Sequence, residues 1–428
     1  MDQAAQPRLT PLGVVTAAWF ITSIYYFYQY AMRSAPAVMV PELSNAFGLT
    51  SVGVASLLGL FYYAYAPFSL VAGVAMDQLG PRKVVPAGAA TVAVGALLFS
   101  TGDPTLASFG RFMQGAGGVF ALIGAAYLVT THFPAYRVAT LIGATQMFGM
   151  AGGSAGQFVV GPAMANGLQW DQFWFWMGLA GLPIAVLLFL FIPPRSKPKQ
   201  ASETPWLKQA ARAMWTVFTN RQSILCGLIS ALIFIPTTIF DMVWGVRFLQ
   251  EAHDVPYSMA VLRSAAVPAG WIIGCPLLGW LSDRLGRRRP VIAGGCIVLL
   301  ITLWMILYGP AHLFPPYSLA LICGIASGAA MIPYTVIKEA NLPEHSGTAT
   351  GVVNFLNFSV TALLGPVFAS RLLSAAVGGE RELEHYQITF QPLLYGVALA
   401  VLLTWILRET GPAARAASPT AEPTPATQ

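Results

Sequence analysis

GVAMDQLGPRK at residues 73–83 and GWLSDRLGRRR at residues 279–289 are two copies of one pattern, and each directly follows a long apolar run. Both read G-x-x-x-D-x-x-G followed by basic residues. The pattern suits a helix that ends, turns tightly at a glycine and re-enters the same apolar environment. We expect the aspartate to cap the next helix and to pair with the following basic cluster. An ordinary charged turn would explain one copy, but two copies at equivalent places indicate two similar halves.

The composition indicates that the chain lives in lipid. Of 428 residues, 56% are apolar and only 9% are charged, whereas soluble domains carry about 25% charged residues. A larger soluble core does not explain this deficit, because single cores stop growing at roughly 250–300 residues. The apolar runs are continuous and do not alternate, so they favour helices over a β-barrel. We therefore predict an all-α integral membrane protein.

The chain divides into twelve segments that are long enough to cross a membrane, at about 20 apolar residues each. Six fall in each half. The predicted spans are 12–40, 50–76, 82–101, 105–131, 137–163, 171–193, 221–250, 255–282, 290–310, 315–337, 347–373 and 387–407. We predict that residues 1–193 and 221–408 form the two halves, joined by a basic linker at 194–220. Residues 409–428 are rich in Ala, Pro and Thr and are predicted to be a disordered tail.

The basic residues predict the orientation. If the amino terminus is cytoplasmic, one side of the membrane receives most of them, as the positive-inside rule requires. That side carries Arg82, Lys83, Arg137, Arg195, Lys197, Lys199, Lys208, Arg212, Arg221, Arg284, Arg287, Arg288, Arg289, Lys338, Arg408 and Arg415. The other side keeps chiefly Arg371 and Arg381. We expect both termini in the cytoplasm and the protein in a bacterial inner membrane. The pI of about 9.2 then reflects topology, and no nucleic-acid partner is inferred.

The sequence carries no motif for catalysis or metal binding. All four cysteines, Cys226, Cys275, Cys296 and Cys323, fall in predicted spans without CxxC or metal spacing. Neither a nucleophile elbow nor a phosphate-binding GxxxxGK[ST] loop occurs. We expect no catalytic residue, no metal and no cofactor, and transport that is not driven by the chain's own ATP hydrolysis.

One charge interrupts the first predicted span. The stretch YYFYQYAMRSAP at residues 25–36 places Arg33 roughly 12 Å inside the outer end of that span. A lipid-facing charge at this depth costs at least about 2.5–3.5 kcal/mol. Snorkelling toward the interface is one explanation. The nearby polar groups of Gln29 and Tyr30 favour the other, a water-filled cavity in which the guanidinium binds an anion.

With these features the sequence resembles the major facilitator superfamily over nearly its whole length. The repeated loop is that superfamily's most specific signature, and RFMQGAGG at residues 111–118 is similar to its R-x-x-Q-G-x-G element. The resemblance implies twelve transmembrane helices in two pseudo-symmetric six-helix bundles that rock around a central site. It also implies a structural or coupling role for Arg111 and Gln114, and a gating role for the loop residues Asp77, Arg82, Asp283, Arg287 and Arg288. The first loop departs from the usual pattern at Gln78 and Pro81.

A second resemblance concerns the substrate. RSAPAVMVP at residues 33–41 resembles the first helix of two branches, the organophosphate/phosphate antiporters and the anion:cation symporters for organic acids. It implies that Arg33 contacts an anionic group, with Tyr30, Tyr65, Gln146 and Asn354 or Asn357 as further substrate contacts. Gln29, in the polar cluster beside Arg33, is another candidate contact. The second arginine of the antiporters is missing near Thr238 or Ile239, and their histidine is missing near Phe148. A singly charged acid is therefore favoured over a phosphate ester.

The symporters usually carry an aspartate directly before the first-helix arginine, and Met32 stands there in this chain. Asp241 in the seventh span is a substitute, because an acid in a membrane helix is a candidate proton carrier. We hypothesise that Asp241 alternates between a proton and Arg33 or Arg263 as its partner. The alternative is a static salt bridge. Arg263 in the eighth span is a second anion contact or the partner of Asp241.

Three functions follow from these residues. The leading one is proton-coupled transport of a small organic anion, a monocarboxylate, by a monomer. A transporter for amino acids or other zwitterions is the first alternative, with Asp241 or aromatic faces holding the amine. Drug or metabolite efflux is the second, because the fifth span GMAGGSAGQFVVGPAMANG is glycine-rich. That span lacks the closing Gly-Gly that efflux members often carry.

Overall fold

The computed structural model describes residues 12–194, 206–309, 315, 317–375 and 382–413. Every regular element within those ranges is helical. Ten helical runs among them are long and apolar enough to cross a membrane. Residues 195–205 of the predicted linker, and the predicted tail from residue 414 onward, lie outside the described residues.

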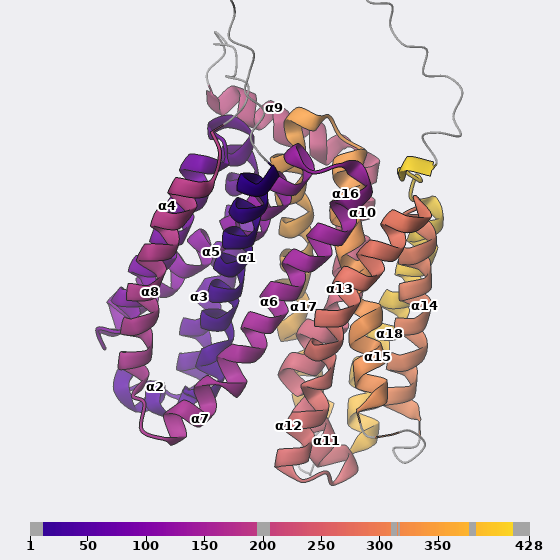
Figure 1. The fold of residues 1–428 in the computed structure, drawn as a ribbon. Helices are drawn as coiled ribbons and strands as arrows, with labels where there is room; N and C mark the ends of the chain where they lie inside the picture. Colours follow the sequence, from indigo (N-terminus) through magenta and orange to yellow (C-terminus); the bar gives the residue numbers. More distant parts are fainter. Residues whose placement is uncertain (1–11, 195–205, 310–314, 316, 376–381, 414–428) are drawn as a thin grey trace, which may run out of the picture.

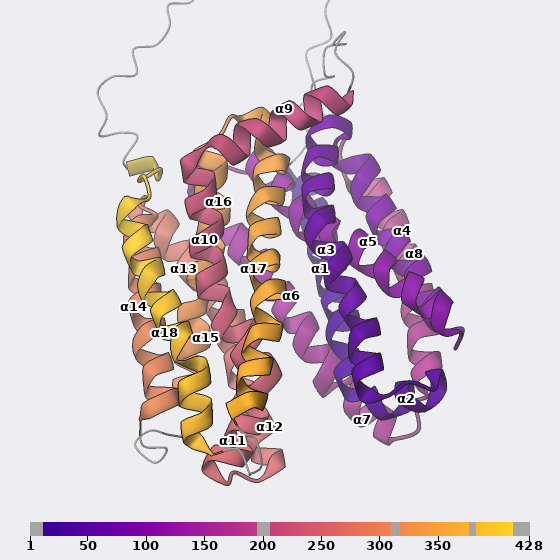
Figure 2. The ribbon, with the colours of Figure 1, turned by 180° about the vertical axis from the view of Figure 1, so that it is seen from behind.

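The helices of the first half gather on one side of the molecule (Figure 1). Their bounds are α1 (Leu12–Ser34), α2 (Val40–Phe47), α3 (Ser51–Leu79), α4 (Pro81–Phe99), α5 (Pro104–His132), α6 (Val138–Phe158), α7 (Val160–Ala165) and α8 (Trp170–Phe191). Helix α9 (Trp206–Thr219) lies within the range predicted as a linker and crosses one end of the molecule (Figure 2).

The helices of the second half gather on the other side (Figure 1). They are α10 (Arg221–Ile235), the π-helix η3 (Pro236–Gly245), α11 (Val246–His253), α12 (Tyr257–Ser264), α13 (Ala266–Leu285), α14 (Arg289–Tyr308), α15 (Ser318–Ser327), α16 (Ile332–Glu339), α17 (Ser346–Ala375) and α18 (Leu383–Ile406). Several predicted spans are therefore built from consecutive helical pieces. The seventh, for example, is α10, η3 and α11 in series.

The two repeated loops turn at glycines, as predicted. Helix α3 ends at Leu79 and α4 begins at Pro81, with Gly80 between them at φ 80°. Helix α13 ends at Leu285, and Gly286 follows at φ 61°. A side chain is strained at such positive φ values, and glycine is not. Proline at the first position of α4 supplies a helical φ and lacks only an N–H that would have no partner there.

The predicted role of the loop aspartates is wrong in one respect, because each caps a helix of the opposite half. Asp77 accepts hydrogen bonds from the backbone N–H groups of Gly347 and Thr348, both at 2.7 Å, at the start of α17. Asp283 accepts from the N–H of Thr140 at 2.8 Å, in the first turn of α6. The next helix along the chain turns away from each carboxylate. The first turn of a helix that crosses from the other half presents free N–H groups to it.

The predicted pairing with the basic cluster holds for one copy of the loop. Arg288 Nη1 lies 2.6 Å from Asp283 Oδ1, and its Nη2 lies 2.8 Å from Glu339 Oε1. Burial alone would lower the pKa of Arg288, but hydrogen bonds and attraction from these two carboxylates raise it. In the first copy, Arg82 instead lies over the ring of Phe189, 5.3 Å from its centroid. Arg287 is exposed.

The halves meet along two seams that depend on glycine. A Cβ added to Gly143 of α6 would lie 2.1 Å from the carbonyl oxygen of Cys275 in α13. A Cβ added to Gly351 of α17 would lie 2.3 Å from the carbonyl oxygen of Ser69 in α3. Small residues at helix crossings let backbones approach this closely in membrane proteins.

Other contacts between the halves gather at the end where α9 lies. Lys338 was predicted to belong to a cytoplasmic loop, but its side chain is buried. Its Nζ donates to the carbonyl of Ala126 in α5 at 2.7 Å. Thr130 of α5 and Ser346 of α17 are hydrogen bonded at 3.0 Å. At the opposite end, α2 and α7 lie apart from α11 and α12 in both views (Figures 1 and 2).

Asp77→Ala is expected to lower the free energy of unfolding by about 1–2 kcal/mol, because the first turn of α17 loses its cap. Thermal denaturation of the detergent-purified protein measures the change. The control is Glu344→Ala at the same end, whose side chain is 69% exposed. It is expected to cost less than about 0.5 kcal/mol. Equal effects of the two substitutions would mean that the cap adds nothing to stability.

Candidate functional site

Arg33 lies in the last turn of α1, closer to a helix end than predicted. Helix α1 ends at Ser34, and a 3-10 turn over Ala35–Val38 follows. Pro36 explains the break, because it has no N–H to donate to the carbonyl of Met32, four residues earlier. After Ser34, the rest of the predicted span 12–40 is therefore made of short, separate helical pieces.

Arg111 supplies the donors that the broken helix lacks. Its Nη1 donates to the carbonyl of Met32 at 3.1 Å, and its Nη2 donates to the carbonyl of Arg33 at 3.2 Å. Nη1 also donates to Gln114 Oε1 at 2.8 Å, and Gln114 Nε2 donates to the carbonyl of Gly95 at 3.1 Å. Arg111 is only 1% exposed. It holds the end of α1 in place and so positions Arg33.

The guanidinium of Arg33 is surrounded by aromatic rings. Its Cζ lies 4.8 Å from the ring centroids of Tyr30, Tyr62 and Phe358. The rings of Phe61 and Tyr65 lie 5.7 Å and 5.8 Å away. We call these five side chains the aromatic cage. They come from α1, α3 and α17, so the guanidinium lies between the two halves and does not face lipid.

The cage leaves part of the guanidinium without a partner. Arg33 Nε donates to the hydroxyl of Tyr62 at 3.2 Å. Its Nη1 is buried and makes no hydrogen bond, and no carboxylate of the described residues forms an ion pair with it. Ring faces stabilise a desolvated cation by about 2 kcal/mol. They do not replace the hydrogen bonds that Nη1 would make in water. An anion with two oxygens would supply them.

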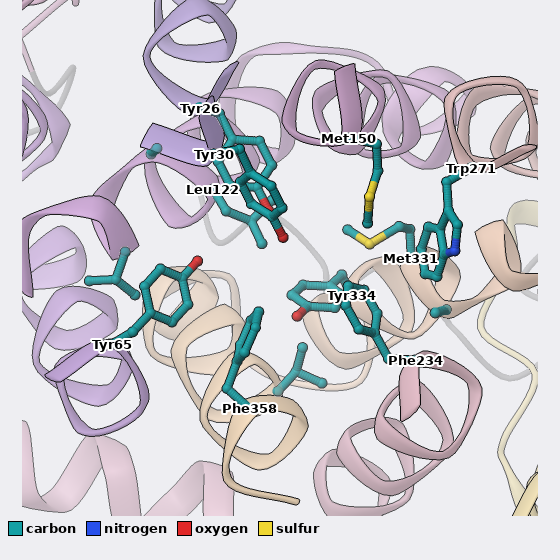
Figure 3. Close-up of a cluster of buried hydrophobic side chains, with 14 of the residues drawn as sticks. Tyr26, Tyr30, Tyr65, Leu122, Met150, Phe234, Trp271, Met331, Tyr334 and Phe358 are labelled. Carbon is teal, nitrogen blue, oxygen red and sulfur yellow. The ribbon is translucent and has the colours of Figure 1, made fainter. Parts of the chain in front are cut away.

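Side chains from both halves meet in one buried cluster, which includes part of the cage. Figure 3 shows Tyr30 and Tyr65 of the first half and Tyr334 and Phe358 of the second pointing toward one another. Met150 and Met331 belong to the same cluster (Figure 3). These residues contribute aromatic and thioether groups, with the tyrosine hydroxyls as their polar atoms.

The predicted asparagines of α17 have different surroundings. Asn354 accepts from the hydroxyl of Tyr334 at 3.0 Å and donates to Ser69 Oγ at 2.8 Å. Both ends of its amide are thus occupied by protein. Asn357 Nδ2 donates to the hydroxyl of Tyr334 at 3.4 Å, and its Oδ1 is buried without a partner. Of the two, Asn357 is the one with an unused acceptor.

The two predicted glutamines are both buried, at 1% exposure each. Gln146 Oε1 accepts from the hydroxyl of Tyr26 at 2.9 Å, and its Nε2 has no partner. Neither amide atom of Gln29 makes a hydrogen bond. Gln29 is directed at α5, where its Oε1 would lie 3.0 Å from a Cβ at Gly118. Unpaired amides like these are costly in a dry interior, and polar ligands or water reduce the cost.

Asp241 lies in the π-helix η3 and is 9% exposed. Its Oδ1 accepts from Ser264 Oγ at 3.1 Å. It forms no ion pair with Arg33 or Arg263 in this conformation. Asp241 and Tyr30 line opposite walls of a cavity of about 100 Å³ between the halves. π-Helical segments occur frequently at functional sites.

Sequence reasoning missed part of this arrangement. Nothing in the sequence except their aromatic character identified Tyr62, Phe61 and Phe358 as site residues. The cage is formed by helices that are far apart in the chain. Pro36 did carry a signal, since proline removes a donor and predicts a break in a helix. Pro236 likewise marks the start of η3.

Comparisons with known proteins agree on one family. The family model described as Major Facilitator Superfamily matches residues 22–366. The chain is 23% identical over 407 residues to a probable sulfoacetate transporter, SauU, of Cupriavidus necator, covering 87% of this chain and 89% of that one. It is also 23% identical over 425 residues to a probable galactarate/D-glucarate transporter, GudP, of Bacillus subtilis, covering 86% and 88%.

A solved structure shows the same fold. The crystal structure of the Major Facilitator Superfamily transporter FucP in the outward conformation superimposes with a TM-score of 0.71. The aligned region covers 94% of this chain and 100% of that one, at 15% identity. At such low identity the likeness concerns the fold alone.

The hydrogen bond between Asn354 and Ser69 is expected to couple the halves. A double-mutant cycle of Ser69→Ala and Asn354→Ala should give a coupling energy of about 0.5–1.5 kcal/mol, read from thermal denaturation. The control cycle pairs Ser69→Ala with Asn357→Ala, which shares no hydrogen bond with Ser69, and should give a value near zero. Equal couplings in the two cycles would refute a specific link through Asn354.

Proposed function

Because this chain belongs to the Major Facilitator Superfamily, a superfamily of transporters and not of enzymes, we propose that it carries a small organic anion, a monocarboxylate, together with a proton. The observation that carries the proposal is the guanidinium of Arg33, which lies between the halves inside the aromatic cage with Nη1 unpaired. Among the described residues that form the cage and the cluster of Figure 3, Arg33 is the one with a charged group that has a buried, unpaired nitrogen.

The proposed architecture has twelve transmembrane helices in two six-helix bundles, residues 1–193 and 221–408. The ten long apolar runs support it. Helices α1 and α6 complete the set, although their inward-facing Tyr, Gln and Thr side chains make them less apolar. Residues 194–220 link the bundles on the cytoplasmic side, and both termini lie there. The protein acts as a monomer in a bacterial inner membrane.

The proposed mechanism is alternating access. The contacts of Asp77, Asp283 and Lys338 seal the α9 end, and the opposite end carries the separated helices α2, α7, α11 and α12. In the proposed orientation these contacts between the halves lie at the cytoplasmic end. Closure at the outer end around a bound anion would strain and release the carboxylate caps at the inner end. Asp77, Arg82, Asp283, Arg287 and Arg288 then belong to the gating loops.

The proposed substrate follows from the charge of the cage. One free guanidinium suits one carboxylate. Arg111 also contacts the cage, 4.9 Å from the ring centroid of Phe61, but its Nη1 and Nη2 both donate to protein acceptors. Tyr30, Tyr65, Gln146 and Asn357 are the proposed polar contacts around it, with Gln29 and Asn354 behind them. The names of the two curated relatives, a sulfoacetate and a galactarate/D-glucarate transporter, support an organic anion.

Asp241 is the proposed proton carrier. It lines the cavity between the halves together with Tyr30, which itself lies against Arg33. A carboxylate that is buried without an ion pair is poised to take up a proton. Protonation removes a negative charge from the central cavity and so favours entry of an anion. Release of the proton on the other side of the membrane would favour release of the anion.

Arg33→Gln is expected to abolish ligand-induced stabilisation by monocarboxylates, because the anion loses its only charged partner. A thermal-shift panel on detergent-purified protein tests this with monocarboxylates, dicarboxylates, sugar acids, phosphate esters, amino acids and hydrophobic cations. Arg33→Lys keeps the charge without the planar fork and should retain a weaker shift. Arg284→Gln is the control, since Arg284 is exposed and lies over Trp280 at 5.2 Å.

Other patterns in the panel would favour the alternatives. Stabilisation by amino acids alone would indicate a zwitterion transporter. Stabilisation by hydrophobic cations in both wild type and Arg33→Gln would indicate efflux and a structural role for Arg33.

Asp241→Asn is expected to abolish accumulation driven by a pH gradient in proteoliposomes, because the carrier can no longer take up a proton. Exchange of labelled for unlabelled substrate at equal concentrations needs no net proton movement and should continue. If the variant accumulated substrate as the wild type does, Asp241 would not be the proton carrier. Asp254→Asn, at an exposed turn beyond α11, is the matched control.

A further inference from the structure

The second half contains a cavity of its own, of about 110 Å³. Its wall is mostly apolar and comes from η3 and helices α11 to α15, with Phe240, Phe248, Leu303 and Ile306 among its members. Four titratable side chains interrupt this wall, namely Asp241, His253, Arg263 and Cys323. The aromatic cage around Arg33 contributes nothing to it.

Arg263 is the unsatisfied group of this cavity. Its Nε is buried and makes no hydrogen bond. No carboxylate of the described residues lies within ion-pair distance of it, although Asp241 lines the same cavity. Asp241 itself accepts from Ser264 at 3.1 Å. Arg263 is therefore a cation without an ion-pair partner in this conformation, and a bound carboxylate would supply one.

We propose that this cavity is a second organic-anion site, which binds a short aliphatic monocarboxylate with its carboxylate on Arg263. The apolar body would lie against Phe240 and Phe248, whose rings pack on each other with their centroids 5.2 Å apart. A cavity of about 150 Å³ with Leu, Ile and Phe walls accepts benzene in another protein, so a body of about four or five carbons suits this one. This site is additional to the one at Arg33 in the proposed function, and the two sites share only the proton on Asp241.

Whether the cavity binds an anion depends on the charges of the side chains that line it. An ionised Asp241 would repel a carboxylate bound a short distance away, in a region of low dielectric. A protonated Asp241 leaves Arg263 as the one charge, which the ligand then neutralises. The groups that face Asp241 are Ser264 and Arg263 of α12, His253 of α11, Cys323 of α15 and, across the other cavity, Tyr30 and Gln157. The residues that α14 contributes, Leu303, Met305 and Ile306, are uncharged. The anion and one proton therefore bind together.

Asp241 and Ser264 also connect the two anion sites. Both residues line this cavity and the cavity between the halves. Asp241 thus borders both the cavity that Tyr30 lines and the cavity that Arg263 lines. A single proton on Asp241 lowers the repulsion felt by an anion on either side. Occupancy of the second site is expected to keep Asp241 protonated and so to favour binding at Arg33.

Isothermal titration of the detergent-purified full chain with 3-methylbutanoate tests the proposal. Wild type is expected to bind two equivalents, Arg263→Gln one and Arg33→Gln one. Arg247→Gln is the matched control, because Arg247 is exposed in the same half and lies over Trp244 at 5.7 Å. It should bind two equivalents. A wild-type stoichiometry of one that Arg263→Gln leaves unchanged would overturn the proposal.

The pH dependence adds a readout that misfolding of a variant would not produce. In the Arg33→Gln background, affinity is expected to fall about tenfold per pH unit once Asp241 is ionised, since one proton binds with each anion. Adding Asp241→Asn should remove this dependence, so that the affinity is the same at each pH. A pH dependence that persists in the double variant would overturn the joint binding of anion and proton.

Cys323 gives a second measurement at the same place. It is a free thiol that lines the cavity. Bound 3-methylbutanoate is expected to slow its modification by methyl methanethiosulfonate at least several-fold, read by peptide mass spectrometry. Cys226, outside the cavity, is the internal reference. Protection that is absent in wild type, or that survives Arg263→Gln, would overturn the site.

The outcomes separate this inference from the proposed function. Loss of one equivalent in Arg263→Gln but none in Arg33→Gln would support the second site and refute the anchor at Arg33. Loss of all binding in Arg33→Gln, with no loss in Arg263→Gln, would support the anchor at Arg33 and refute the second site.

Discussion

In hydrocarbon, each backbone N–H and carbonyl needs a partner inside the protein, and this requirement explains the main features of the structure. Helices satisfy it along their length and fail at their ends and at prolines. The break in α1 at Pro36 is a case in point, because the carbonyls of Met32 and Arg33 would otherwise stay unpaired there. Arg111 reaches both from α5. These two hydrogen bonds fix the end of α1, and they fix the position of Arg33 with it.

The same requirement joins the two halves. The first turns of α17 and α6 present N–H groups that have no partner in their own helices. Asp77 and Asp283 accept from them across the interface, each from the opposite half. These caps are made at one end of the molecule only. They depend on relative position, so a rocking motion can make and break them without unfolding any helix.

The buried basic side chains differ in whether all their nitrogens have partners. Arg288 is paired with Asp283 and Glu339, and Lys338 donates to a carbonyl of α5. Arg33 and Arg263 differ, because each keeps a buried nitrogen without a partner. Unpaired buried donors reduce stability, and folding alone gives no reason to retain them. Arg263 lines a cavity of the second half, and Arg33 lies against Tyr30, which lines the cavity between the halves; Asp241 lines both cavities. These unsatisfied groups are therefore the basis of both proposed anion sites.

The sequence by itself determined the membrane class, the helical spans, the repeated glycine turns and the candidates Arg33 and Asp241, because composition, periodicity and turn chemistry are local properties. It also indicated the superfamily, which the comparisons confirm. Only the tertiary structure decided what each of those residues contacts. The aromatic cage joins α1, α3 and α17, the carboxylate caps cross between halves, and Lys338 is buried where a loop was predicted. The tertiary structure also decided that Asp241 forms no ion pair with Arg33 or Arg263 in this conformation. These facts depend on how helices far apart in the chain pack against one another, and no local pattern in the sequence records that packing.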